Sequence, residues 1–118
     1  MSYLRNQVGH IYITMRELKF RFWDSIAKQM LPVLDSWEVG NLANQAERFP
    51  VMQYTGLLDS KGVEIYESDI VKSTTGKWDS GEVMFRNTAF RVHAYILCQL
   101  EDIEVIGNIY QDSHLTSK

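Results

Sequence analysis

The sequence predicts a mainly β domain: a small barrel or roll, preceded by a β-hairpin and accompanied by one short helix. Three observations predict it. Residues 16–24 alternate between apolar and polar side chains, turn residues recur at short intervals after residue 51, and only residues 35–50 have a helical composition. Several short strands separated by turns are typical of small β-barrels and rolls. The length of 118 residues is that of one domain.

The hairpin is predicted over residues 16–34. Leu18, Phe20 and Phe22 fall on one face of the segment RELKFRFWD, and a period of two indicates a half-buried strand. Asp24 opens a turn region, and MLPVL (30–34) returns as a second strand. Pro32 lacks a backbone donor, so that strand is expected at a sheet edge or at a bend.

The helix is expected within residues 35–50, with a loop as the alternative. The segment NLANQAERF contains good helix formers, and Asn41 is in position to cap its start. Gly40 and Pro50 suit its boundaries. Because the segment is short, we expect its stability to come from docking on the sheet.

The barrel is predicted over residues 51–110. Short strands are expected at 51–54, 63–66, 70–72, 82–85, 89–97 and 103–110. Thr55-Gly56 is expected to break the first strand. Four residues are expected to hold the turns, because glycine tolerates positive φ and aspartate accepts hydrogen bonds from nearby backbone: Gly56, Asp59, Gly62 and Asp69.

Charge and cysteine content limit the function classes. The net charge of −3 argues against a dedicated duplex-DNA binder. Residues 1–34 hold five basic and two acidic residues, so the rest of the chain is strongly acidic. This split indicates either a solvated strand face or a basic half that meets the acidic half of another subunit in a homo-oligomer. The only cysteine, Cys98, lies in an apolar run and is expected to be buried.

The location expected for the protein is the cytoplasm of a bacterial host. No stretch approaches the roughly 20 apolar residues that a spanning helix needs, so no membrane partner is expected. Residues Arg5, Gln7 and His10 interrupt the apolar core that a signal peptide would need.

Five blocks in order carry a resemblance to a known family. They are MRELKFRFWD (15–24), MQYTGLLDSKGVEIYESDIVK (52–72), GEVMF (81–85), AF (89–90) and EVIGNIY (104–110). Together they resemble the YopX family of phage and prophage proteins. The resemblance implies a mainly β, SH3-like barrel and no established activity. It makes residues 15–118 a single domain and residues 1–14 an N-terminal extension.

Two departures from the family pattern affect turns. Ser68 stands where the pattern favours glycine, so that turn is not expected to hold a positive φ. Asn87-Thr88 replaces a more usual Asn-Gly, which favours a turn wider than type I′.

Catalytic signatures are weak, and the sequence predicts no enzyme, cofactor or metal. The three histidines are far apart, and no phosphate-binding or dinucleotide-binding fingerprint appears. His93 is expected within a strand, solvent-facing or partly packed. The carboxylates of Glu64, Glu67 and Asp69 suggest a metal-dependent hydrolase as a remote alternative, but turn-holding explains Asp69 better.

Binding is the favoured function. The sequence predicts a non-enzymatic, oligomeric phage accessory protein with a host or phage protein as partner. Single-stranded nucleic acid is a less favoured ligand, which would stack on aromatic side chains beside cations. The candidate surface residues are Lys19, Arg21, Trp23 and Trp78. The alternative is that each tryptophan covers the edge of the core.

Overall fold

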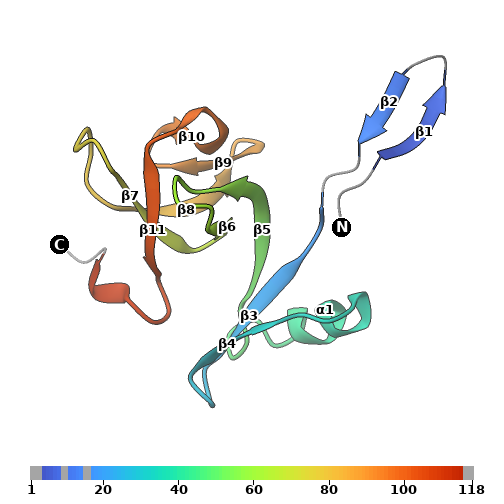
Figure 1. The fold of residues 1–118 in the computed structure, drawn as a ribbon. Helices are drawn as coiled ribbons and strands as arrows, with labels where there is room; N and C mark the ends of the chain where they lie inside the picture. The colour runs from blue at the N-terminus through green and yellow to red at the C-terminus, as the bar shows by residue number, and fades with distance from the viewer. Residues whose placement is uncertain (1–3, 9–10, 15–16, 116–118) are drawn as a thin grey trace. The chain divides into compact units, whose positions relative to one another are not determined.

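The computed structural model describes residues 4–8, 11–14 and 17–115 (Figure 1). The chain divides into two compact units, Met1–Gly56 and Leu57–Lys118. Antiparallel strands dominate both, and α1 (Ser36–Ala43) is the single α-helix of the described residues. The prediction of a mainly β chain with one short helix is therefore confirmed. No helix among these residues is long and apolar enough to cross a membrane.

The first unit contains two sets of strands. β1 (Leu4–Val8) and β2 (Ile11–Thr14) form a separate antiparallel hairpin. β3 (Phe20–Asp24) lies between β4 (Gln29–Pro32) and β5 (Val51–Leu58), and all three are antiparallel. Pro32 lies on the edge strand β4, as predicted. The predicted hairpin begins at residue 16, which lies outside the described residues.

The two faces of β3 are not buried as the alternation predicted. Trp23 is only 8% exposed, whereas Leu18 precedes the strand and is 60% exposed. Phe22 is half-buried and packs edge-on against Phe49, with ring centroids 6.2 Å apart. The segment that follows the helix therefore covers part of the strand, and a simple inside–outside alternation does not apply.

The predicted helix start at Asn41 is wrong, because an earlier cap begins the helix. Asp35 is the N-cap, and its Oδ1 accepts a hydrogen bond from the Glu38 amide at 2.8 Å. The Glu38 Oε1 in turn accepts from the Leu34 amide at 2.9 Å. This reciprocal arrangement resembles a capping box, and it satisfies two backbone donors at once. Gly40 and Asn41 consequently lie inside the helix.

The second unit is a five-stranded antiparallel sheet that curls into a half-barrel, in the order β10-β9-β8-β7-β11. A core of seven side chains fills it: Ile65, Val71, Val83, Phe90, Val92, Leu97 and Ile103. The strands of this sheet are β7 (Asp69–Ser73), β8 (Gly81–Arg86), β9 (Ala89–Val92), β10 (Tyr95–Ile96) and β11 (Ile103–Asn108). The unit also contains β6 (Glu64–Tyr66), which does not belong to this sheet, and the 3₁₀-helices η1 (Leu97–Gln99) and η2 (Ser113–Leu115).

Two strand predictions in this region are wrong. β5 does not break at Thr55-Gly56 but continues to Leu58. Gly56 therefore lies within the strand rather than in a turn, with a φ of 87° that glycine tolerates. The predicted strand 89–97 breaks at His93, whose φ is 55°, and η1 follows β10. Leu97 then occupies the core at 1% exposure, which leaves Cys98 exposed rather than buried.

Both turn predictions based on missing glycines are also wrong. Asn87 and Thr88 have φ values of 50° and 63°, and Arg86 pairs with Ala89. A two-residue loop with positive φ at both positions is the type I′ turn that matches strand twist. Ser68 has a φ of 71°. Its amide donates to the Val83 carbonyl at 2.9 Å, so the surrounding strands impose a conformation that serine disfavours.

The Asp59 carboxylate connects the turn after β5 to β11. Its Oδ1 accepts from the amides of Lys61 and Val63 at 2.8 Å each, and its Oδ2 accepts from the Val105 amide at 2.9 Å. Ser60 adds a second tie, because its Oγ donates to the Ile103 carbonyl at 2.7 Å. Asp59 is buried and Gly62 has a φ of 84°.

Asp69 holds the next turn in a similar way. It is 2% exposed, and its Oδ2 accepts from the Tyr66 amide at 2.8 Å. Beyond β11, Asn108 Oδ1 accepts from the amides of Tyr110 and Gln111 at 3.0 Å each. Short polar side chains therefore shape the chain reversals of this unit, as such side chains do in Asx-type turns.

The hydrogen bonds of Asp59 make stability depend on pH. Burial alone would raise the pKa of Asp59, but donors from Val105, Val63 and Lys61, with the Lys61 charge, lower the pKa below the ordinary 3.8. A carboxylate whose pKa is lowered by folding stabilises the fold above its unfolded pKa, and this contribution is lost as pH falls through the folded pKa.

We therefore expect Asp59→Asn to lower the free energy of unfolding at pH 7 by about 2–3 kcal/mol. Urea titrations of both proteins from pH 7 to pH 2 measure the difference, which should shrink below about pH 4. Glu101→Gln, which removes an exposed carboxylate, is the control and should change stability by less than about 0.5 kcal/mol. A difference that is constant with pH would contradict this role for Asp59.

Candidate binding site

The candidate residues of β3 and its approach do not form an exposed stacking surface. Lys19 Nζ lies 3.4 Å from Glu17 Oε2 and 4.9 Å from the centre of the Tyr54 ring. Arg21 is half-buried, and Trp23 is buried within the first unit. Trp78 belongs to the second unit. Of the two tryptophans predicted to lie on the binding surface, Trp23 is therefore buried, whereas Trp78 has exposed aromatic neighbours.

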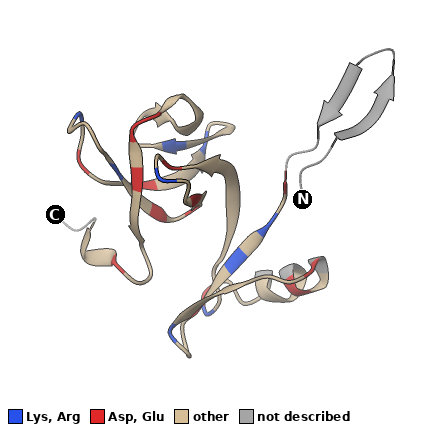
Figure 2. Ribbon diagram, viewed as in Figure 1, with Lys and Arg blue, Asp and Glu red and all other residues tan. Residues whose placement is uncertain are grey.

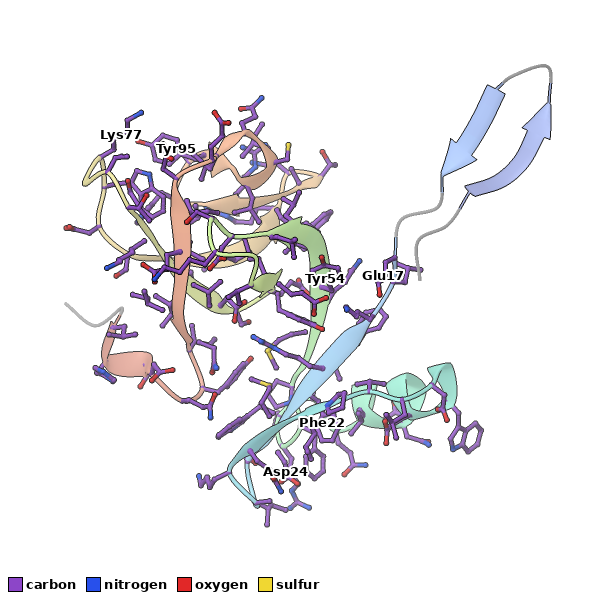
Figure 3. All side chains as sticks on the ribbon, in the orientation of Figure 1. Glu17, Phe22, Asp24, Tyr54, Lys77 and Tyr95 are labelled. Carbon is purple, nitrogen blue, oxygen red and sulfur yellow. The ribbon has the colours of Figure 1, made fainter. Side chains whose placement is uncertain are left out.

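Trp78 is the centre of an aromatic cluster with His93 and Tyr95. The Trp78 and Tyr95 rings are stacked, with centroids 6.0 Å apart and planes 29° apart. The His93 ring meets Trp78 edge-on at 5.4 Å. Tyr95 is 45% exposed, and Figure 3 shows it at the same edge of the unit as Lys77. Trp78 is half-buried and packs against the core, so the cluster has a fixed base.

Gly81 leaves the space that the His93 ring occupies. A Cβ on Gly81 would come within 2.7 Å of His93 Nε2 and 2.8 Å of Val92 Cγ2. His93 Nε2 also lies 3.3 Å from the Asp79 carbonyl, and Arg86 donates to the His93 carbonyl at 2.8 Å. The positive φ of His93 and the bare backbone of Gly81 together bring the imidazole to Trp78.

A hollow of about 120 Å³ lies beside the aromatic cluster. Its apolar lining comes from Trp78, Leu100 and Ile103. Its polar lining is contributed by Ser73, Thr75, Lys77, Gln99, Glu101 and Asp102. Two separate segments, the β7–β8 loop and the stretch from η1 to β11, therefore converge on it. A larger hollow of about 530 Å³ is lined only by residues 44–48, which belong to one turn.

Hydrogen bonds order the loop that borders the hollow. Ser73 Oγ accepts from the amides of Thr75 and Lys77 at 3.3 Å each, and it lies 3.0 Å from Thr75 Oγ1. The Thr74 amide donates to the Asp102 carbonyl at 2.8 Å, which joins the two segments. Gly76 adopts a φ of 77° between these ties. The loop is consequently arranged before any ligand arrives.

The surroundings of the hollow are acidic. The sequence from residue 57 to residue 118 contains six basic and ten acidic residues. Figure 2 shows Asp and Glu on several elements of this unit. Among residues 17–115, the exposed Glu101 and Asp102 make no ion pair. Lys77 is the single cation in the lining.

The other charged features of this unit are structural in character. Glu104 Oε2 lies 2.8 Å from Lys61 Nζ, and this hydrogen bond lowers the pKa of Glu104 and raises that of Lys61. Burial raises the pKa of Glu82 on β8. The described residues include no group of three His, Cys, Asp or Glu side chains that could hold a metal ion. Glu64, Glu67 and Asp69 therefore form no such group in the part of the chain that the structure describes.

Comparison with known proteins identifies the family. The model of the family described as YopX protein matches residues 19–116. The chain belongs to the YopX family. The resemblance carried by the five sequence blocks is thus confirmed.

Two solved structures share the fold of this YopX family member. Protein EF1440 from Enterococcus faecalis has a TM-score of 0.67 and 24% identity, over 87% of this chain and 100% of that chain. Protein yopX from Bacillus subtilis has a TM-score of 0.55 and 21% identity, with the same coverage. Identities this low establish the fold alone. No curated protein matches the chain.

Sequence reasoning found Trp78 but missed its partners. His93 and Tyr95 lie 15 and 17 positions further along the chain. The residues 99–103 that line the hollow were not predicted to belong to a site. Gly81, directly before the strand EVMF, was the one available signal, because a glycine there permits the close approach of another side chain.

We expect Gly81→Ala to disturb the aromatic cluster. The new methyl group would push the His93 ring and Val92 away, at a cost of about 1–3 kcal/mol in the free energy of unfolding. Urea unfolding, monitored by tryptophan fluorescence, measures this cost. In NMR spectra, loss of the ring-current shifts of the His93 protons would report that the ring has moved away from Trp78.

Gly40→Ala is the matched control, since no atom lies within 4 Å of its added Cβ and the residue is helical. It should stabilise the protein by about 0.5–1 kcal/mol. Equal effects of the two substitutions would contradict the role given to Gly81.

Proposed function

We propose that this YopX family protein is a non-enzymatic binding module, encoded by a phage or prophage and acting in the bacterial cytoplasm. In this proposal the half-barrel is an SH3-like scaffold that presents a protein-binding site. The observation that carries the proposal is the Trp78–His93–Tyr95 cluster beside the hollow of about 120 Å³. Aromatic side chains fixed on a rigid sheet are typical of the centres of protein interfaces.

The size of the hollow supports a macromolecular partner over a small molecule. Pockets that enclose small-molecule ligands measure about 300–1,000 Å³. The hollow of about 120 Å³ is too small for such a ligand but accommodates part of a side chain that belongs to a larger surface.

The charge supports a protein over a nucleic acid. Phosphate groups would meet Glu101 and Asp102 at the edge of the hollow, with Lys77 as the single cation in the lining. Proteins that bind single strands combine stacking side chains with a positively charged groove. The acidic half-barrel lacks that second component, so nucleic acid remains the less favoured ligand.

Loss of Tyr95 should test the site. Tyr95→Ala removes a partly exposed ring that stacks on Trp78 but lies outside the core. We expect affinity capture from a bacterial lysate to recover partner proteins with the wild-type chain. The Tyr95→Ala variant should retain these partners about 5- to 30-fold less, as for an interface hot spot. Quantitative mass spectrometry of the eluates measures the ratio.

Phe85→Ala is the control, since Phe85 is an exposed ring of the same unit that packs on Phe90. It should retain those partners within about two-fold. Identical capture by wild type and Tyr95→Ala would remove this site from the proposal.

We further propose that the protein is a homo-oligomer. The support is the uneven charge along the sequence and two apolar side chains, Leu34 and Trp37, that are 80% and 77% exposed. Tryptophan is enriched at interface centres, and burial of its apolar surface in an interface is favourable.

Light scattering after size exclusion should give at least twice the chain mass of 13.7 kDa at micromolar concentration. Trp37→Ser should shift the protein toward the single-chain mass, while Ile26→Ser, at an exposed residue of the β3–β4 turn, should not. A single-chain mass for wild type would end the oligomer proposal.

A further inference from the structure

The hollow beside Trp78 has the dimensions of an anchor site for one side chain. Its volume of about 120 Å³ is well below the roughly 300–1,000 Å³ of pockets that enclose small-molecule ligands. The volume of about 120 Å³ is comparable to the side chain of a leucine, a proline or a small aromatic residue. Trp78 and Leu100, which are packed on the core, give it apolar walls that do not need to move.

The two carboxylates at the edge of the hollow determine which ligand residue can lie next to the anchor side chain. Glu101 and Asp102 are consecutive and exposed, and among residues 17–115 neither makes an ion pair. The Asp102 carbonyl is occupied by the Thr74 amide, which fixes the backbone that carries both carboxylates. A ligand cation near the anchor would therefore find two acceptors already in position.

We infer that the hollow binds a short extended peptide segment in which an apolar side chain lies next to a lysine or arginine. The apolar side chain fills the space between Trp78 and Leu100. The cation pairs with Glu101 and Asp102, and the exposed Tyr95 ring covers the neighbouring peptide residue. This inference rests on the proposed binding function and specifies the chemical class of its ligand.

Polar groups in the lining suit an extended backbone. Gln99 and Thr75 line opposite segments of the hollow and offer side-chain donors and acceptors at its edge. An extended peptide presents unpaired backbone groups along its length, and such side chains can satisfy them without a change in the fold. Recognition of one side chain and one charge by a preformed aromatic surface is a recurring mode of peptide binding.

A selection with the full chain as bait tests the inference. The probe is a library of random heptapeptides displayed in several copies per particle, which favours no chemistry in advance and retains weak binders through avidity. We expect the enriched pool to place Lys or Arg within one to three positions of Leu, Pro or an aromatic residue. A pool that is acidic, that lacks an apolar residue, or that is not enriched over an empty support would overturn the inference.

Individual enriched peptides are then titrated against a fluorophore on Cys98. This is the only cysteine of the chain, it is exposed, and it directly precedes Gln99 of the lining. We expect dissociation constants of about 0.1–1 mM, because a single anchor gives weak binding. Raising the salt concentration from 50 mM to 500 mM should weaken binding further, since exposed charges are screened.

Charge variants locate the site. Glu101→Gln combined with Asp102→Asn keeps the backbone bond of Thr74 and should weaken the peptides about three- to ten-fold. Glu47→Gln combined with Glu64→Gln removes the same charge at residues outside the lining and should change affinity less than two-fold. Circular dichroism melts check that all variants are folded. Equal affinity for both double variants would overturn the inference.

An oligodeoxythymidylate of 12 nucleotides is the competing probe. Displacement of the selected peptide by this oligonucleotide at 50 mM salt would favour a nucleic-acid ligand and overturn the peptide assignment. The Tyr95→Ala capture distinguishes the two failures. Partners that still depend on Tyr95 would leave the binding function intact even if the peptide chemistry is different.

Discussion

The buried Asp59 carboxylate is the interaction on which the second unit depends. It accepts from Val105, 46 positions away in sequence, and from two amides of its own turn. Ser60 holds the Ile103 carbonyl across a separation of 43 positions. The first residues of β11 are thereby fixed against the turn that follows β5. Because residues 99–103 enter β11 directly, the same bonds set where the carboxylates of Glu101 and Asp102 lie.

A second constraint acts from the opposite side of the hollow. Ser73 orders the loop that carries Trp78, and Gly81 leaves the space that the His93 ring fills. Both residues remove conformational freedom from neighbouring groups, so that little ordering would remain to be done on binding. The unit thus resembles a scaffold whose strands are short but whose connections are individually fixed.

The sequence predicted the features that depend on local chemistry. Aspartate and glycine at positions 59 and 62 indicated a turn, and the ordered motif blocks indicated the family. Prediction failed where tertiary register overrides local preference, as at Ser68 and at Asn87-Thr88, where strand pairing imposes positive φ. Trp78 was predicted as a candidate, but its stacking on Tyr95 and the hollow that it lines together with residues 99–103 result from sheet topology that periodicity does not encode.

The acidic character of the half-barrel and the small hollow have complementary consequences for recognition. Charge accelerates encounter with cationic ligands and disfavours phosphate, but it adds little affinity in water. In the proposed binding mode the hollow would add affinity, but a volume of about 120 Å³ limits it to one anchor. Such a module would bind weakly as a single copy. Linked copies would convert weak sites into avid ones, because a second contact forms at high effective concentration. The proposed self-association and the proposed peptide recognition would therefore reinforce each other, and the exposed Trp37 of the first unit is the kind of side chain that self-association would use.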